Sequence, residues 1–94
     1  MHERALMVDV MRKIDEIATE GGADRVVVVG VRLGALSHFT PDHFREHFVD
    51  ASRGTIAEGA EVDAVVDDDT TGDRARDVVI ERVEIELPDR AEVH

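Results

Sequence analysis

The segment Arg25–Leu33 (RVVVVGVRL) is the part of the sequence that most restricts the fold. It is almost continuous in β-branched residues, and Gly34 closes it. Such a run is typical of a strand covered on both faces, so we expect this strand to be buried above and below. The core must be aliphatic, because the chain has 3 Phe and neither Trp nor Tyr. A chain of 94 residues has room for one core and therefore for one domain.

Two other segments have the apolar spacing of amphipathic helices. The first runs from residue 3 to about residue 20 and ends at Gly21-Gly22. Its predicted buried face consists of Leu6, Val10, Ile14, Ile17 and Ala18. The second has Thr40 as N-cap and Pro41 at its first position, and it runs to about residue 53. Its predicted buried side chains are Phe44, Phe48 and Ala51.

Two further strands follow the second helix. Residues 60–66 (AEVDAVV) alternate as in a half-buried strand, with Ala60, Val62, Ala64 and Val66 on one side. Residues 78–87 form the last strand, and its inward side chains are predicted to be Val83, Ile85 and Leu87. Glu81 breaks this alternation, which predicts a β-bulge or a late strand start near it. The polar segment 67–77 (DDDTTGDRARD) between the two strands is predicted to be a loop.

This order of elements predicts an α+β fold in two layers, with two helices packed on a three-stranded mixed β-sheet. The strand at 25–33, the second helix and the strand at 60–66 can form a right-handed crossover, which makes the two strands parallel. We expect residues 1–94 to form a single domain.

The charge balance disfavours polyanionic partners. The chain has 22 acidic and 11 basic residues, for a net charge of −11. Such a surface repels phosphate backbones and anionic lipids, so neither nucleic acid nor a membrane is an expected partner. The same charge favours solubility and basic partners. The first 13 residues contain several charges and no apolar signal region, and no segment can span a bilayer, so we expect a cytoplasmic protein.

No catalytic residues are predicted. The chain has 0 cysteines, which excludes disulfides, thiolate zinc sites and cysteine nucleophiles. No serine or threonine lies in a nucleophile motif, and the two glycines of GVRLGAL lack the spacing that cradles phosphates. We therefore do not expect an enzyme.

HFREH at 43–47 matches H-x-x-E-H, the inverted zincin motif. His43 and His47 would share one helix face, as a metal pair requires. A protease would also need a third ligand from another element and a substrate cleft. We interpret the match as a coincidence, with metal binding at the two histidines as a minor alternative. A small metallohydrolase that uses His43, Glu46 and His47 is the least favoured interpretation.

The segment 67–78 (DDDTTGDRARDV) begins like a calcium-binding loop. The twelfth position of such a loop holds a bidentate Glu, but here it is Val78, and a strand-like segment follows in place of a helix. These differences exclude an EF-hand and leave a weak surface cation site as the alternative.

His2 directly follows the initiator methionine, and spacing alone leaves two interpretations of it open. It is either a polar residue at a frayed terminus or a metal ligand that acts together with the free amine beside it. The terminal nitrogen and the His2 backbone nitrogen can close a five-membered chelate, to which the imidazole adds another donor. Nitrogen donors in this arrangement suit the square-planar geometry of Ni(II) and Cu(II). The initiator methionine is normally retained before a large second residue, so we expect the amine to stay next to His2.

Taken together, four segments resemble the HypA/HybF family of nickel metallochaperones in hydrogenase and urease maturation. They are MHE at 1–3, VVVVGVRLGALSHFTPDHFREHF at 26–48, GTIAEGAEV at 54–62 and VIERVEIEL at 79–87. The resemblance implies the same α+β layout and a domain that binds nickel without catalysis. It also implies that Ni(II) is held at Met1, His2 and Glu3, by the terminal amine, the His2 side chain and backbone nitrogens. The implied partners are a nickel-handling GTPase and the precursor of a [NiFe] hydrogenase large subunit, or a urease pathway.

The sequence departs from the family pattern in one place. The family inserts a zinc ribbon with two CxxC pairs before the last strand, whereas here residues 67–77 form a short polar segment without cysteine. We therefore expect no zinc. The loss of the ribbon also leaves a second interpretation, in which the chain is a protein–protein interaction module that has kept the fold and lost the metal.

Overall fold

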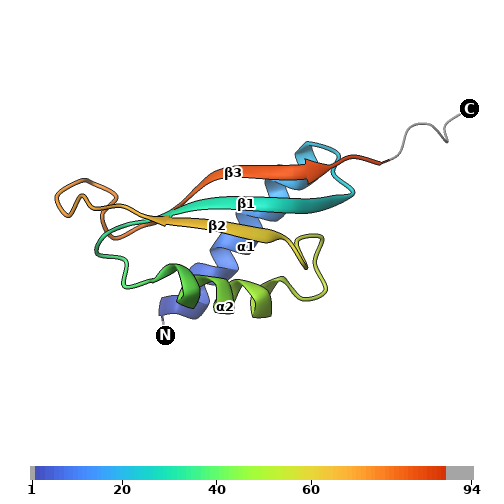
Figure 1. The fold of residues 1–94 in the computed structure, drawn as a ribbon. Helices are drawn as coiled ribbons and strands as arrows, with labels where there is room; N and C mark the ends of the chain where they lie inside the picture. Colours follow the sequence, from blue (N-terminus) through green and yellow to red (C-terminus); the bar gives the residue numbers. More distant parts are fainter. Residues whose placement is uncertain (1, 89–94) are drawn as a thin grey trace, which may run out of the picture.

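The computed structural model describes the backbone of residues 2–88 and the side chains of residues 4–88. Along the chain lie α1 (His2–Glu20), β1 (Arg25–Leu33), α2 (Pro41–Ser52), β2 (Glu61–Val66) and β3 (Val78–Glu86) (Figure 1). The predicted order of two helices and three strands is confirmed, and the predicted ends lie within one residue of the observed ones.

The three strands form one mixed sheet in the order β2-β1-β3. β1 runs parallel to β2 and antiparallel to β3, and Val29 pairs with Val62 on one side and with Val83 on the other. Parallel neighbours need a crossover connection, which α2 supplies between β1 and β2. The predicted α+β class and the parallel strand pair are therefore confirmed.

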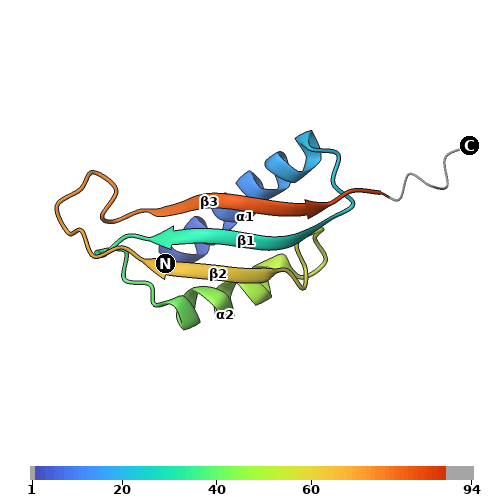
Figure 2. The ribbon, with the colours of Figure 1, turned by 45° about the horizontal axis from the view of Figure 1, so that its top comes forward.

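Both helices lie on the same face of the sheet, which Figure 2 shows with the sheet in front of them. The prediction that β1 is covered on both faces is therefore wrong. The side chains of β1 that are buried toward the helices are Val26, Val29, Val31 and Leu33. On the opposite face Arg32 is exposed, and the Arg82 side chain of β3 lies across Gly30, where a Cβ would come within 3.0 Å of the Arg82 Cγ. The aliphatic parts of these arginine side chains partly cover that face, so its valines are half-buried. A run of β-branched residues can therefore form a strand that helices cover on one face only.

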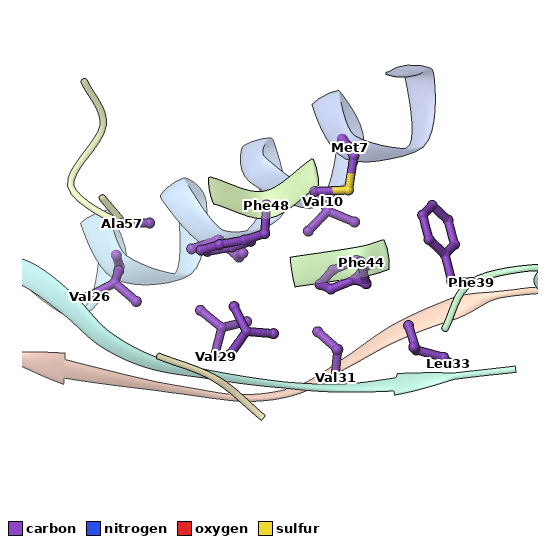
Figure 3. Close-up of a cluster of buried hydrophobic side chains, with 13 residues drawn as sticks. Met7, Val10, Val26, Val29, Val31, Leu33, Phe39, Phe44, Phe48 and Ala57 are labelled. Carbon is purple, nitrogen blue, oxygen red and sulfur yellow. The ribbon is translucent and has the colours of Figure 1, made fainter. Parts of the chain in front are cut away.

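The core fills the space between the helices and the sheet (Figure 3). Phe44 and Phe48 of α2 are 0% and 1% exposed, as predicted, and Ala51 is half-buried against the same core. Val29 of β1 is fully buried in the same cluster. The contribution of α1 consists of Met7, Val10, Ile14 and Ala18. An aliphatic core around three phenylalanines is therefore confirmed.

The buried stripe of α1 differs from the prediction at two positions. Ile17 is 44% exposed, so its predicted burial is wrong, and Met7, which was not predicted, is 4% exposed. The stripe passes through Met7 because α2 packs on that side of the helix, and Met11 beside it is also partly buried. No helix in residues 2–88 has both the length and the apolarity that crossing a bilayer requires.

Glu81 is the extra residue of a β-bulge, as the broken alternation predicts. Gly30 pairs with Arg82, but the next residue of β1, Val31, pairs with Ile80. The bulge allows Ile80 and Val83 both to pack against the core, although they are three positions apart. The Glu81 carboxylate accepts a hydrogen bond of 2.7 Å from Arg32 Nε on the open face of the sheet.

The ends of the two edge strands are less buried than predicted. Val62 of β2 is buried and Ala64 is partly buried, but Val66 is 43% exposed. Leu87 lies beyond the end of β3 and is 55% exposed, so its predicted inward position is wrong. Both exposed residues lie at strand ends, beyond the positions that pack against the core cluster.

Residues 67–77 form a loop, as predicted, and this loop is docked on the end of β1. The Gly34 N–H donates to the Asp77 carbonyl at 2.8 Å, and the Leu36 N–H donates to the Ala75 carbonyl at 2.6 Å. Ala75 is buried, and a Cβ at Gly34 would overlap its backbone carbonyl. Glycine at position 34 is therefore required for the close approach of the loop.

Exchange of Ile14 and of Ile17 for alanine tests the observed face of α1. Ile14→Ala should lower the free energy of unfolding by about 2–5 kcal/mol, because it opens a cavity in a fully buried site. Ile17→Ala is the matched control and should cost about 0.5 kcal/mol or less. Urea denaturation measures both, and equal losses in the two variants would contradict the observed orientation of α1.

The N-cap of α2 generates a second prediction. The Thr40 hydroxyl accepts a hydrogen bond of 3.1 Å from the His43 N–H, and Pro41 follows at the first helical position. Thr40→Ala should therefore lower stability by about 1 kcal/mol in thermal or urea unfolding. Thr40→Ser retains the hydroxyl and should stay close to the parent. A Thr40→Ala protein as stable as the parent would show that the cap does not stabilise α2.

Candidate metal site

Two of the three predicted nickel ligands, His2 and Glu3, are the first residues of α1. Met1 lies outside the described residues, and so do the side chains of His2 and Glu3. The backbone of His2 and Glu3 is described, and it forms the first turn of the helix. The structure therefore gives the position of this backbone but does not test the predicted ligands.

The start of a helix has backbone nitrogens that the helix itself does not use. The first four N–H groups of an α-helix have no intrahelical acceptor. Since α1 begins at His2, the backbone nitrogens of His2 and Glu3 belong to this group. A metal could take these nitrogens as ligands without breaking a hydrogen bond of the helix.

A groove of about 840 Å³ separates the first turns of α1 from α2. Arg4, Met7, Val8 and Met11 line it from α1, and His47, Asp50, Ala51 and Arg53 line it from α2 and the residue that caps it. Figure 1 shows the beginning of α1 next to the first half of α2. His47 is thus a neighbour of the helix end that carries the Met-His-Glu segment.

His43 and His47 lie together on α2, as their spacing predicts. Their Nε2 atoms are 3.0 Å apart and their ring centroids are 4.6 Å apart. Both residues are half-buried. At this separation one ring can donate to the other, and the tautomers decide which ring donates.

Phe39 supports this histidine pair and was not predicted as part of a site. Its ring centroid lies 5.4 Å from His43 and 6.2 Å from His47, and its edge packs on Phe44 at 5.7 Å. His38 just before it has φ 69°, in the left-handed region, and is exposed. Phe39 follows directly and is buried in the core, which its polar neighbours in the sequence do not indicate.

The third residue of the H-x-x-E-H motif does not join the two histidines. Glu46 is exposed on α2. Among the side chains of residues 4–88, no three His, Cys, Asp or Glu residues come together as a metal site. The interpretation of HFREH as a hydrolase motif therefore has no support in the described part of the chain.

The acidic loop after β2 uses its carboxylates for its own turns. Asp69 accepts hydrogen bonds from the Thr71 N–H at 2.9 Å and from the Thr71 hydroxyl at 2.8 Å. These bonds to Thr71 lower the pKa of the Asp69 carboxyl below its ordinary value. β3 follows the loop directly, in place of the exiting helix of a calcium site. The exclusion of an EF-hand is confirmed.

The open face of the sheet carries ion pairs within and between strands. Arg82 of β3 bonds to Glu84 at 2.9 Å and to Asp63 of β2 at 3.3 Å, and both carboxylates raise the pKa of its guanidinium above the ordinary value. Arg32 of β1 pairs with Glu81 in the same way. All of these groups are exposed, so each pair contributes little to stability.

Comparison with known proteins places these features in a family. A family model described as hydrogenase/urease nickel incorporation, metallochaperone, HypA, matches residues 1–72. The hydrogenase maturation factor HypA of Methylocella silvestris is 40% identical over 63 residues, which are 67% of this chain and 56% of that protein. HypA of Pyrococcus furiosus is 42% identical over 62 residues, 66% of this chain and 45% of its own length. The match thus spans about half the length of these curated relatives.

The fold has a counterpart among solved structures. The solution structure of the Ni metallochaperone HypA from Helicobacter pylori superimposes with a TM-score of 0.67 at 14% sequence identity, over 89% of this chain and 97% of that one. At this identity the likeness shows the fold. The family description is that of a metallochaperone and not of an enzyme, in agreement with the prediction of no catalysis. Because the family model covers residues 1–72 of the 94, the chain belongs to the HypA family of hydrogenase/urease nickel-incorporation metallochaperones.

Proposed function

We propose that the chain binds Ni(II) as cargo at Met1, His2 and Glu3 and delivers it, without catalysis, for the maturation of a [NiFe] hydrogenase. The observation that carries the proposal is the family match, which begins at residue 1 and so includes the Met-His-Glu segment. The position of this segment at the start of α1 supports it, because its backbone nitrogens are not held in helical hydrogen bonds.

The proposed site uses nitrogen donors. The Met1 amine and the His2 backbone nitrogen form one chelate ring, and the His2 imidazole and the Glu3 backbone nitrogen complete a plane of four. Such a set suits Ni(II), which favours square-planar coordination by strong nitrogen donors. The positive end of the α1 dipole favours the negative charge of deprotonated amides, and this helps these nitrogens to lose their protons to the metal. The Glu3 carboxylate is proposed to influence how readily nickel enters and leaves.

The proposed unit is a single nickel-binding domain of residues 1–94. The loop 67–77 stands where the family resemblance places a zinc ribbon, and its docking on Gly34 joins β2 to β3 without disturbing the core. With 0 cysteines in the chain, we propose that no zinc is bound. The proposed partners are a nickel-handling GTPase and a hydrogenase large-subunit precursor, and the net charge of −11 favours basic surfaces on them. Service to a urease is the alternative within the same family.

Calorimetric titration with Ni(II) tests the proposal on protein with a free Met1 amine. The parent should bind one equivalent of Ni(II) tightly at residues 1–3, and His2→Ala should weaken this tight binding by about 100-fold or more, because an inner-shell ligand is lost. A short extension before Met1 should have the same effect, because it converts the amine into an amide. His38→Ala is the matched control, since it removes an exposed histidine of the described chain, and it should bind like the parent.

Two results would contradict the proposal. Equal binding by the parent and His2→Ala would move the nickel to another site. A parent that binds no nickel but still captures a maturation partner would favour the interpretation of the chain as an interaction module that has lost its metal.

A further inference from the structure

We infer that His43 and His47 form a second metal site, a chelate of two imidazoles on α2 that binds Ni(II) and related first-row divalent ions. This site goes beyond the proposed function, which uses only residues 1–3. The inference starts from the distance of 3.0 Å between the two Nε2 atoms, which come from one face of one helix.

That distance is the one that two neighbouring ligands of a single ion require. Metal–imidazole bonds are about 2.0–2.1 Å long, so two nitrogens at a right angle around an ion are about 2.9 Å apart. The observed separation of 3.0 Å between the Nε2 atoms of His43 and His47 differs from this value by about 0.1 Å. An ion could therefore replace the contact between the rings once both side chains rotate to turn their Nε2 lone pairs toward it.

The surroundings hold the two rings in place. The Thr40 cap fixes the first turn of α2 through the His43 N–H. The Phe39 ring lies against both imidazoles, and both histidines are half-buried. Ligands ordered in advance lose less conformational entropy when they bind, so this arrangement favours chelation over a pair of mobile surface histidines.

The pair also has an open side. His47 lines the groove between α1 and α2, which gives water room to occupy the remaining positions around an ion. The charges around this groove are mixed, since Arg4 and Arg53 line it together with Asp50, and Arg53 pairs with Asp50 at 3.0 Å. The net charge of −11 attracts cations to the protein as a whole. Imidazole nitrogen suits Ni(II), Cu(II) and Zn(II) rather than Mg(II) or Ca(II), so the ligand type selects the class of ion.

The site lies beside the first turns of α1, since Arg4 and Met7 line the groove together with His47. If the proposed function holds, an ion on the pair lies across this groove from the helix that begins with the proposed nickel ligands. The pair would then hold nickel on its way to or from that segment.

The test uses Ni(II) chloride and the His2→Ala chain, in which the N-terminal ligand is removed. Two imidazoles and water around Ni(II) give a six-coordinate, paramagnetic ion, whereas a plane of four nitrogens gives a diamagnetic one. One equivalent of Ni(II) should therefore broaden the NMR ring signals of His43 and His47 more strongly than those of His38. On this background His43→Gln and His47→Gln should each weaken binding by about 10-fold or more, and His38→Gln should not.

Glutamine keeps a polar side chain that can still form a hydrogen bond on α2, so these variants test metal binding in a folded chain, which circular dichroism verifies. If Ni(II) leaves the ring signals of His43 and His47 sharp, or if both glutamine variants bind as well as the His2→Ala parent, the pair is only hydrogen-bonded and the inference fails.

The two proposals fail separately. A diamagnetic nickel site in the chain with His2 does not depend on the pair, and binding at the pair in the His2→Ala chain does not depend on His2.

Discussion

The packing of α1 and α2 against each other over one face of the sheet is the interaction on which the rest of the structure depends. Phe44 and Phe48 are fully buried between the two helices and β1, and Ile14 of α1 is buried in the same cluster (Figure 3). Without this contact the first turns of α1 would have no fixed neighbour. With it, the backbone of His2 and Glu3 lies at the beginning of α1, whose first turns form a groove with His47 of α2.

The two faces of the sheet differ in character. The helices and the covered face of the sheet form an aliphatic and aromatic core, while the open face carries exposed ion pairs around Arg32 and Arg82 beside half-buried valines of β1. The loop 67–77 is docked at the C-terminal end of β1 by backbone hydrogen bonds to Gly34 and Leu36. Ala75 of this loop is buried outside the core cluster, and Arg74 lines a groove together with Leu6 and Val10, so the loop lies beside the first turns of α1.

Much of the fold could be predicted because local signals and the final structure agree. Thr40 and Pro41 mark the start of α2, and the misplaced Glu81 marks the bulge of β3. The predictions that failed depended on contacts between distant elements. The side of α1 on which α2 packs determines the burial of Met7 and the exposure of Ile17. The continuous valines of β1 do not reveal whether helices or arginine stems cover the second face.

The candidate site could be predicted only in part. The pairing of His43 and His47 follows from their helical spacing, but their distance of 3.0 Å depends on side-chain rotamers that spacing does not determine. The contact of the Phe39 ring with His47 and the position of His47 next to α1 depend on tertiary packing. The ligands at residues 1–3 were predicted from the resemblance and the chemistry of their nitrogens, and they stay a prediction.

An X-ray absorption spectrum of the chain loaded with one equivalent of Ni(II) tests the central claim most directly, because it reports the atoms around the metal. We expect four nitrogen donors in a plane, one of them an imidazole, with the short bonds of a square-planar ion. A six-coordinate shell of oxygen and nitrogen donors with two imidazoles would contradict it, since nickel would then prefer His43 and His47 to the start of α1.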